Sequence, residues 1–159
     1  MTSYYFAYGS NMNADRMTAR DVGFSSVESG QLQHSIIRFN KRAANPGSGH
    51  ANVNFAPGRH VQGLLYRLSH PAEIRKLDVF ESTPRNYSRE KLWIQTQHTR
   101  QVAWVYIANR AVIDENLKPE RWYMNHLLAG SAYLSSEYFA WLQSFDCIDH
   151  DPQDRPLHL

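Results

Sequence analysis

The stretch Tyr4-Tyr5-Phe6-Ala7-Tyr8-Gly9-Ser10-Asn11 stands near the start of the chain. Its apolar half is typical of a β-strand, and this strand runs directly into a glycine. Glycine lets a backbone approach a ligand closely and adopt unusual dihedral angles. Serine and asparagine are good helix N-caps, so a short helix is expected after Asn13. The free N–H groups at such a turn can bind an anion or serve as an oxyanion hole, although a tight turn without a ligand has the same sequence.

The composition indicates one folded domain. The chain has 159 residues, of which 42% are hydrophobic and 20% are charged, which is enough for a sizeable core. The net charge is only +2 and the basic residues are scattered, so we expect no nucleic-acid partner. No apolar run approaches the ~20 residues of a membrane helix, and Ser10 and Asn11 interrupt the only early candidate for a signal peptide. A single cysteine, Cys147, excludes an internal disulfide and favours the reducing cytoplasm.

Hydrophobic periodicity predicts strands first and most helices late in the chain. About six strands are expected, over residues 4–8, 31–39, 51–55, 60–68, 87–97 and 102–108. The turn between the third and fourth is predicted at Pro57-Gly58. Helices are expected from Pro71, from Pro119 to near Gly130, and after Ser135. This order favours an α+β fold or a small barrel with helices packed outside. We predict one domain over residues 1–148 and a loose polar tail over residues 149–159.

Several motifs together resemble those of the γ-glutamylcyclotransferase family, also known as AIG2-like. Residues 5–12, followed by Arg16-Met17 and Arg20, are similar to the family's N-terminal signature. Residues 61–66 resemble its V-x-G-x-x-Y strand, and residues 77–81 resemble its L-D-x-x-E helix end. Tyr87, Tyr123 and Gly130 match later positions. The matches follow the family's order and cover roughly residues 4–145.

The resemblance implies a small mixed β-barrel flanked by helices, a γ-glutamyl small-molecule substrate, no cofactor or metal, no membrane partner, and a monomer or homodimer. In the implied reaction, the substrate's α-amine attacks its own γ-carbonyl, so that 5-oxoproline forms and a free amine or amino acid leaves. The implied catalytic residue is Glu81. The implied substrate-binding residues are Tyr5, Phe6, Ala7, Tyr8, Gly9, Ser10, Asn11, Tyr87 and Tyr123.

Glu81 has the chemistry that this reaction needs. Cyclisation requires a base for the α-ammonium and an acid for the leaving nitrogen, and one carboxyl group can serve as both. A glutamate at the C-terminal end of the helix from Pro71 has its pKa raised by the helix dipole, and burial would raise it further. Without the family match, a glutamate at a helix end is typical of a solvated surface. Core packing is the corresponding alternative for Tyr87 and Tyr123.

Other chemistries have weaker support. Ser10 lacks the G-x-S-x-G pattern of a nucleophile elbow, and Cys147 follows an apolar helix stripe, as a buried structural thiol would. The histidines form no zinc-binding motif.

The identity of the leaving group stays open. Ser82 stands where the family often has glycine directly after the glutamate. The residues that select the leaving group are expected in the loops 45–50 and 83–86. A γ-glutamylamine or γ-glutamyl-acyl variant of the chemistry, or a non-catalytic barrel that binds a small ligand or a protein, are the alternatives.

Overall fold

The computed structural model describes residues 1–149. The predicted tail lies outside these residues except for Asp149. The strands are β1 (Ser3–Ala7), β2 (Phe24–Arg42), β3 (Gly49–Leu68), β4 (Tyr87–Gln95) and β5 (Arg100–Ala108). The α-helices are α1 (Ala14–Ala19), α2 (Ile74–Phe80), α3 (Arg121–Leu128) and α4 (Ser136–Gln143). Short 3₁₀ turns, η1 to η4, cover Ser10–Met12, Pro71–Glu73, Arg110–Val112 and Ser131–Tyr133.

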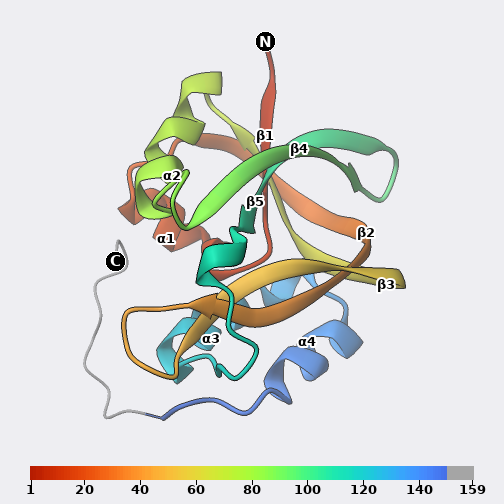
Figure 1. The fold of residues 1–159 in the computed structure, drawn as a ribbon. Coiled ribbons are helices and arrows are strands. Elements are labelled where there is room, and N and C mark those ends of the chain that lie inside the picture. The colour runs from red at the N-terminus through yellow and green to blue at the C-terminus, as the bar shows by residue number, and fades with distance from the viewer. Residues whose placement is uncertain (150–159) are drawn as a thin grey trace.

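The strands form a closed barrel in the order β1-β3-β2-β4-β5. All neighbours are antiparallel except β1 and β5, whose parallel pairing at Tyr5 and Trp104 closes the barrel. Figure 1 shows α1 and α2 at one side of this barrel and α3 and α4 across its lower end. The prediction of an α+β fold, with a small mixed barrel flanked by helices, is confirmed. The described residues contain five strands rather than about six.

The number of strands is lower than predicted because the loop at Pro57-Gly58 does not end a strand. Gln33 pairs with His60 and Ser35 pairs with Phe55, so residues 56–59 loop out opposite His34 alone. Gly58 has a φ of +76°, and its N–H donates to His34 Nδ1 at 3.2 Å. The two strands predicted over 51–55 and 60–68 are therefore one strand, β3, because its pairing with β2 continues on both sides of the loop.

Strand β2 begins at Phe24 and not at residue 31. Residues 25–30 are mostly polar and give no strong strand signal. They are held in the sheet by register, for example by the pairing of Val27 with Tyr66. This is a tertiary effect that overrides local propensity.

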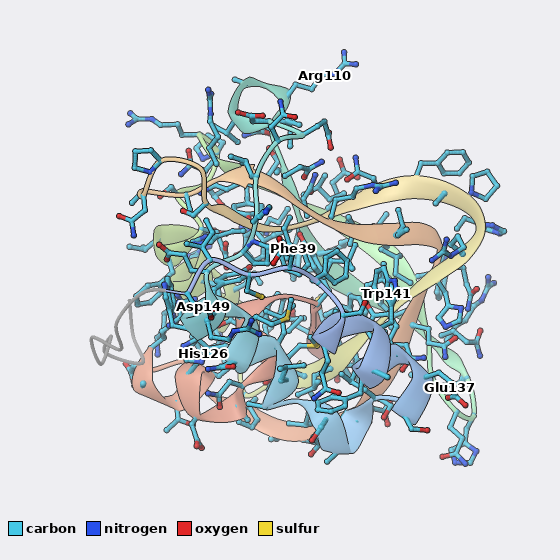
Figure 2. All side chains as sticks on the ribbon, turned by 90° about the horizontal axis from the view of Figure 1, so that it is seen from below. Phe39, Arg110, His126, Glu137, Trp141 and Asp149 are labelled. Atoms are coloured by element: carbon cyan, nitrogen blue, oxygen red, sulfur yellow. The ribbon has the colours of Figure 1, made fainter. Side chains whose placement is uncertain are left out.

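The helices occur where they were predicted and cover the barrel's apolar surface. Asn13 caps α1 by accepting the N–H of Asp15, and Ser135 caps α4 by accepting the N–H of Tyr138. One face of α4 points inward, with Tyr138 and Leu142 buried. Figure 2 shows Trp141 within the body of the molecule and Glu137 pointing outward.

No helix within residues 1–149 is long and apolar enough to span a membrane. In the same part of the chain, no group of three or more His, Cys, Asp or Glu residues is placed to hold a metal ion.

Candidate active site

A cavity of about 470 Å³ lies where the end of β1 meets α1, the end of α2 and the start of α3. Most of the residues singled out from the sequence line it, namely Tyr5, Tyr8, Gly9, Ser10, Asn11, Glu81, Tyr87 and Tyr123. They come from distant parts of the chain, and the closed barrel brings them together. Phe6 and Ala7 do not line this cavity, because both are fully buried in the core.

The turn after β1 presents free backbone donors at the cavity wall. Within residues 1–149, the N–H groups of Gly9, Ser10 and Asn11 have no acceptor, whereas those of Met12 and Asn13 close the 3₁₀ turn. Gly9 has a φ of −113°, so a left-handed backbone is not what requires glycine here. A Cβ at this position would lie 3.0 Å from the Tyr123 hydroxyl and 3.3 Å from the Ala51 Cβ. The close approach of α3 and β3 therefore favours glycine at this position.

Asn11 attaches this turn to the barrel, because its side chain and its carbonyl oxygen are engaged in hydrogen bonds with other elements. Its Nδ2 donates to the Tyr5 hydroxyl at 3.1 Å, and its Oδ1 accepts from Arg20 Nη1 at 3.1 Å. Its carbonyl oxygen accepts from the Tyr66 hydroxyl at 2.6 Å. The geometry of the turn is thus imposed by buried polar contacts from several elements.

The L-D-x-x-E motif positions Glu81 at the cavity. Leu77 is fully buried, and the Asp78 carboxylate accepts from Arg89 Nε at 2.8 Å and from the Tyr106 hydroxyl at 2.7 Å. These contacts hold the end of α2 against β4 and β5. Glu81, the residue after α2, is partly buried and lines the cavity. Leu77 thus anchors the motif in the core, Asp78 holds the end of the helix in place, and Glu81 lines the cavity.

The electrostatics of Glu81 suit a group that exchanges a proton. Burial raises the pKa of the Glu81 carboxyl above its usual value, and the charges of Arg20, Lys41 and Arg16 oppose that rise. Burial, which the sequence argument named beside the helix dipole, is the main cause of the rise. Burial, assisted by the charge of Arg20, lowers the pKa of Arg16 to about 10, so Arg16 remains charged at neutral pH. The Glu81 carboxyl thus shares one cavity wall with three buried cations.

Ser82 follows Glu81 in a left-handed conformation, with a φ of +49°. The N–H of Thr83 donates to the Asp78 carbonyl at 3.0 Å and the N–H of Ser82 donates to the Val79 carbonyl at 3.2 Å, which is a Schellman C-cap. Glycine is favoured at this position because a Cβ is strained there. Ser82, which stands where the family often has glycine, therefore introduces backbone strain directly beside Glu81.

Replacement Ser82→Gly is expected to raise the free energy of unfolding by about 0.5–1 kcal/mol. It removes about 1–2 kcal/mol of left-handed strain and costs about 0.5–1 kcal/mol of added chain entropy in the unfolded state. Chemical denaturation measures the change. Ser26→Gly, at an exposed position of β2, is the control and should lower stability. A loss of similar size in both variants would contradict strain at Ser82.

Tyr87 and Tyr123 belong both to the cavity wall and to the core. Both line the cavity, and their exposed fractions are 5% and 4%. The Tyr87 hydroxyl donates to the Ala51 carbonyl at 2.8 Å, and the Ala51 N–H donates to the Tyr123 hydroxyl at 2.9 Å. One residue of β3 is therefore held by both tyrosines. Each of these tyrosines is therefore a cavity residue and a core residue at once, although the sequence analysis treats the two roles as alternatives.

Replacement Tyr123→Phe is expected to lower the free energy of unfolding by about 1–3 kcal/mol, because it leaves the buried Ala51 N–H without an acceptor. Thermal or chemical denaturation measures the loss. The control is Tyr4→Phe, since within residues 1–149 the Tyr4 hydroxyl makes no hydrogen bond. Full stability in Tyr123→Phe would show that this hydroxyl does not serve the core.

The sequence argument missed several cavity residues. Lys41, Glu120 and Trp122 also line it, whereas His50, a further wall residue, lies in the segment 45–50 that is expected to select the leaving group. Phe39 and Asn40 together face Ala51, since Arg38 pairs with Asn52 and Lys41 pairs with His50. This β-bulge leaves consecutive residues of β2 buried, so the inward position of Lys41 does not follow from simple alternation.

Comparison with known proteins places this geometry in context. A protein-family model described as "Gamma-glutamyl cyclotransferase, AIG2-like" matches residues 5–125. The search of curated proteins found no match at its significance threshold.

Solved structures share the fold. One described as a γ-glutamyl cyclotransferase has a TM-score of 0.81 at 21% identity, over 96% of this chain and 93% of that chain. An uncharacterised protein from Homo sapiens has a TM-score of 0.82 at 22% identity, over 96% of this chain and 92% of that chain. A γ-glutamyl cyclotransferase specific to glutathione, from yeast, has a TM-score of 0.63 at 10% identity, over 89% of this chain and 93% of that chain.

Proposed function

Because the chain belongs to the γ-glutamyl cyclotransferase, AIG2-like family, we propose that its cavity converts a γ-glutamyl compound into 5-oxoproline and a free amine or amino acid. The observation that carries the proposal is the cavity itself. It combines one carboxylate of raised pKa, Glu81, with the unpaired N–H groups of the Gly9 turn and with buried cations.

In this proposal, the Gly9 turn and the arginines of α1 hold the anionic groups of the substrate. Arg16 Nε donates to the Ser10 hydroxyl at 3.1 Å, so its charge is fixed next to the turn. Backbone N–H groups and a guanidinium at one place favour a carboxylate, or the oxyanion that develops on the γ-carbonyl oxygen. Holding the glutamyl chain folded, with its amine near its γ-carbonyl carbon, supplies much of the rate enhancement.

Glu81 would transfer the protons. It takes one proton from the α-ammonium, and the free amine then attacks the γ-carbonyl carbon and forms the new C–N bond. Glu81 passes the proton to the leaving nitrogen as the old amide C–N bond breaks. A second proton follows from the ring nitrogen to the departing amine, so Glu81 ends as it began and no water is consumed. A raised pKa helps, because a carboxylate with the usual pKa of about 4.3 is a weak base toward an ammonium.

The test is incubation of the protein with a panel of γ-glutamyl dipeptides and γ-glutamyl amines, with 5-oxoproline followed by chromatography. Release of 5-oxoproline from at least one compound is expected. The matched α-glutamyl dipeptides are the control and should release none, since their amine and scissile carbonyl are on the same carbon. Absence of release across the γ-glutamyl panel would contradict the proposal and favour a non-catalytic barrel.

A further inference from the structure

Lys41 is a buried cation that the proposed proton transfer does not use. Its exposed fraction is 8%, it lines the cavity, and its Nζ lies 5.5 Å from the centre of the Tyr87 ring. Within residues 1–149, this ammonium has no hydrogen-bond acceptor and no carboxylate oxygen within 4.0 Å. In contrast, Lys76 is partly exposed, Lys118 is exposed, and both are paired with carboxylates. Burying an ammonium without a partner is costly, which points to an anion supplied by a ligand.

Lys41 stands apart from the cations at the Gly9 turn. Arg16 lies on α1 and Arg20 directly follows its end, and they are bonded to that turn through Ser10 and Asn11. Lys41 comes from β2, at the strand position that pairs with His50, and within residues 1–149 no hydrogen bond joins its ammonium to the turn. Burial lowers the pKa values of Arg16, Arg20 and Lys41, and the charge of Glu81 opposes this fall in all three. The carboxylate thus lies within electrostatic reach of two separate groups of cations.

The substrate's charges can be matched to this arrangement. A γ-glutamyl compound carries its α-carboxylate on one side of the scissile amide. A γ-glutamyl amino acid carries a second carboxylate on the other side, on the carbon next to the leaving nitrogen, whereas a γ-glutamyl amine carries none. With the first carboxylate at the turn and the reacting atoms at Glu81, the second would reach toward Lys41. The other carboxylate in the cavity wall, Glu120, accepts from Asn45 and from the Trp122 indole.

Building on the proposed function, we propose that Lys41 binds the carboxylate of the leaving amino acid. It is then a specificity-determining residue, and the substrates are γ-glutamyl amino acids rather than γ-glutamyl amines. Leaving this carboxylate out, or removing the ammonium, costs a charge-assisted hydrogen bond. Such a bond corresponds to about 10- to 150-fold in kcat/KM.

The test compares γ-glutamylalanine with γ-glutamylalaninamide, which differ only in this carboxylate. The wild type is expected to prefer the acid by about 10- to 150-fold in kcat/KM. Lys41→Met should bring the ratio of the two values close to one, and Lys41→Arg should keep the acid preferred. Lys91→Met, at an exposed position over Trp104, is the control and should retain the wild-type ratio. The wild-type ratio tests the proposal even if a variant at residue 41 does not fold.

Two results would overturn it. Equal kcat/KM for acid and amide in the wild type would show that the carboxylate is not bound. Equal losses for both compounds in Lys41→Met would show that Lys41 acts on Glu81 instead. If these two compounds and the rest of the γ-glutamyl panel yield no 5-oxoproline, the proposed function has failed and not the role of Lys41. The affinities of the wild type and of Lys41→Met for the acid and the amide are then measured by calorimetry. A preference for the acid that the variant loses supports carboxylate binding by Lys41, and equal affinities of the wild type for both compounds refute it.

Discussion

Glu81→Gln is expected to lower the rate of 5-oxoproline release at least about a hundredfold. Glutamine keeps the shape of the side chain but cannot take a proton from the substrate's ammonium. General acid–base catalysis typically contributes about 10²- to 10⁴-fold, which is about 3–5 kcal/mol of barrier. Substrate binding should persist, since the Gly9 turn and the α1 arginines hold the carboxylate in the proposal. Steady-state kinetics and calorimetry measure the two effects separately.

Glu81→Gln is also expected to change how the stability of the protein depends on pH. The pKa of Glu81 is raised in the folded protein, so folding favours its protonated form. At pH values above this raised pKa, the wild type bears a carboxylate that the folded state disfavours, so Glu81→Gln should be the more stable protein there. As the pH falls through the raised pKa, the wild type should gain stability relative to the variant. The difference should become constant below the unfolded glutamate pKa of about 4.3.

Glu28→Gln, at an exposed position of β2, is the control for both measurements. It should leave turnover and the pH dependence of stability unchanged. Near-normal turnover in Glu81→Gln would refute its role as the acid–base group. A variant that binds no substrate would instead indicate that Glu81 shapes the cavity.

Gly63→Ala is expected to lower the free energy of unfolding by about 3 kcal/mol or more. A Cβ at Gly63 would lie 2.2 Å from the Ala7 carbonyl oxygen and 2.9 Å from the Phe6 ring. The nearest atom belongs to the backbone of β1, which pairs with β3 and is locked by the closed barrel. Overpacking a core typically costs about 1–3 kcal/mol, and an immobile backbone neighbour places this site at the upper end.

Gly58→Ala is the matched control. No atom lies within 4 Å of its Cβ position, and its φ of +76° is the only source of strain. A loss of about 1 kcal/mol is expected there. Chemical denaturation compares the two variants, and similar losses would contradict the steric argument. Because β1 leads into the Gly9 turn, Gly63→Ala should also impair activity before the protein unfolds.

The sequence by itself predicted the elements whose signals are local. The apolar residues 4–8 end in a turn with glycine, Asn13 and Ser135 cap helices, and the spacing on α4 defines its buried face. These features depend on neighbours within one or two turns of the chain, so periodicity and capping chemistry suffice to predict them. The motif matches, which follow the family's order, predicted the barrel flanked by helices and identified Glu81 as the candidate catalytic residue.

The tertiary structure decided what depends on strand pairing. The looped-out residues 56–59 remain within one strand because β2 pairs with β3 on both sides of them. Phe6 and Ala7 adjoin the substrate-binding candidates in sequence, but both are fully buried in the core, where β3 packs closely against them at Gly63. A bulge opposite Ala51 leaves Lys41 buried at the cavity, and no local pattern encodes that position. Burial in the closed barrel, rather than the helix end alone, raises the pKa of Glu81. Residue identity supplies the chemical groups, whereas their distances and their solvation follow only from the folded barrel.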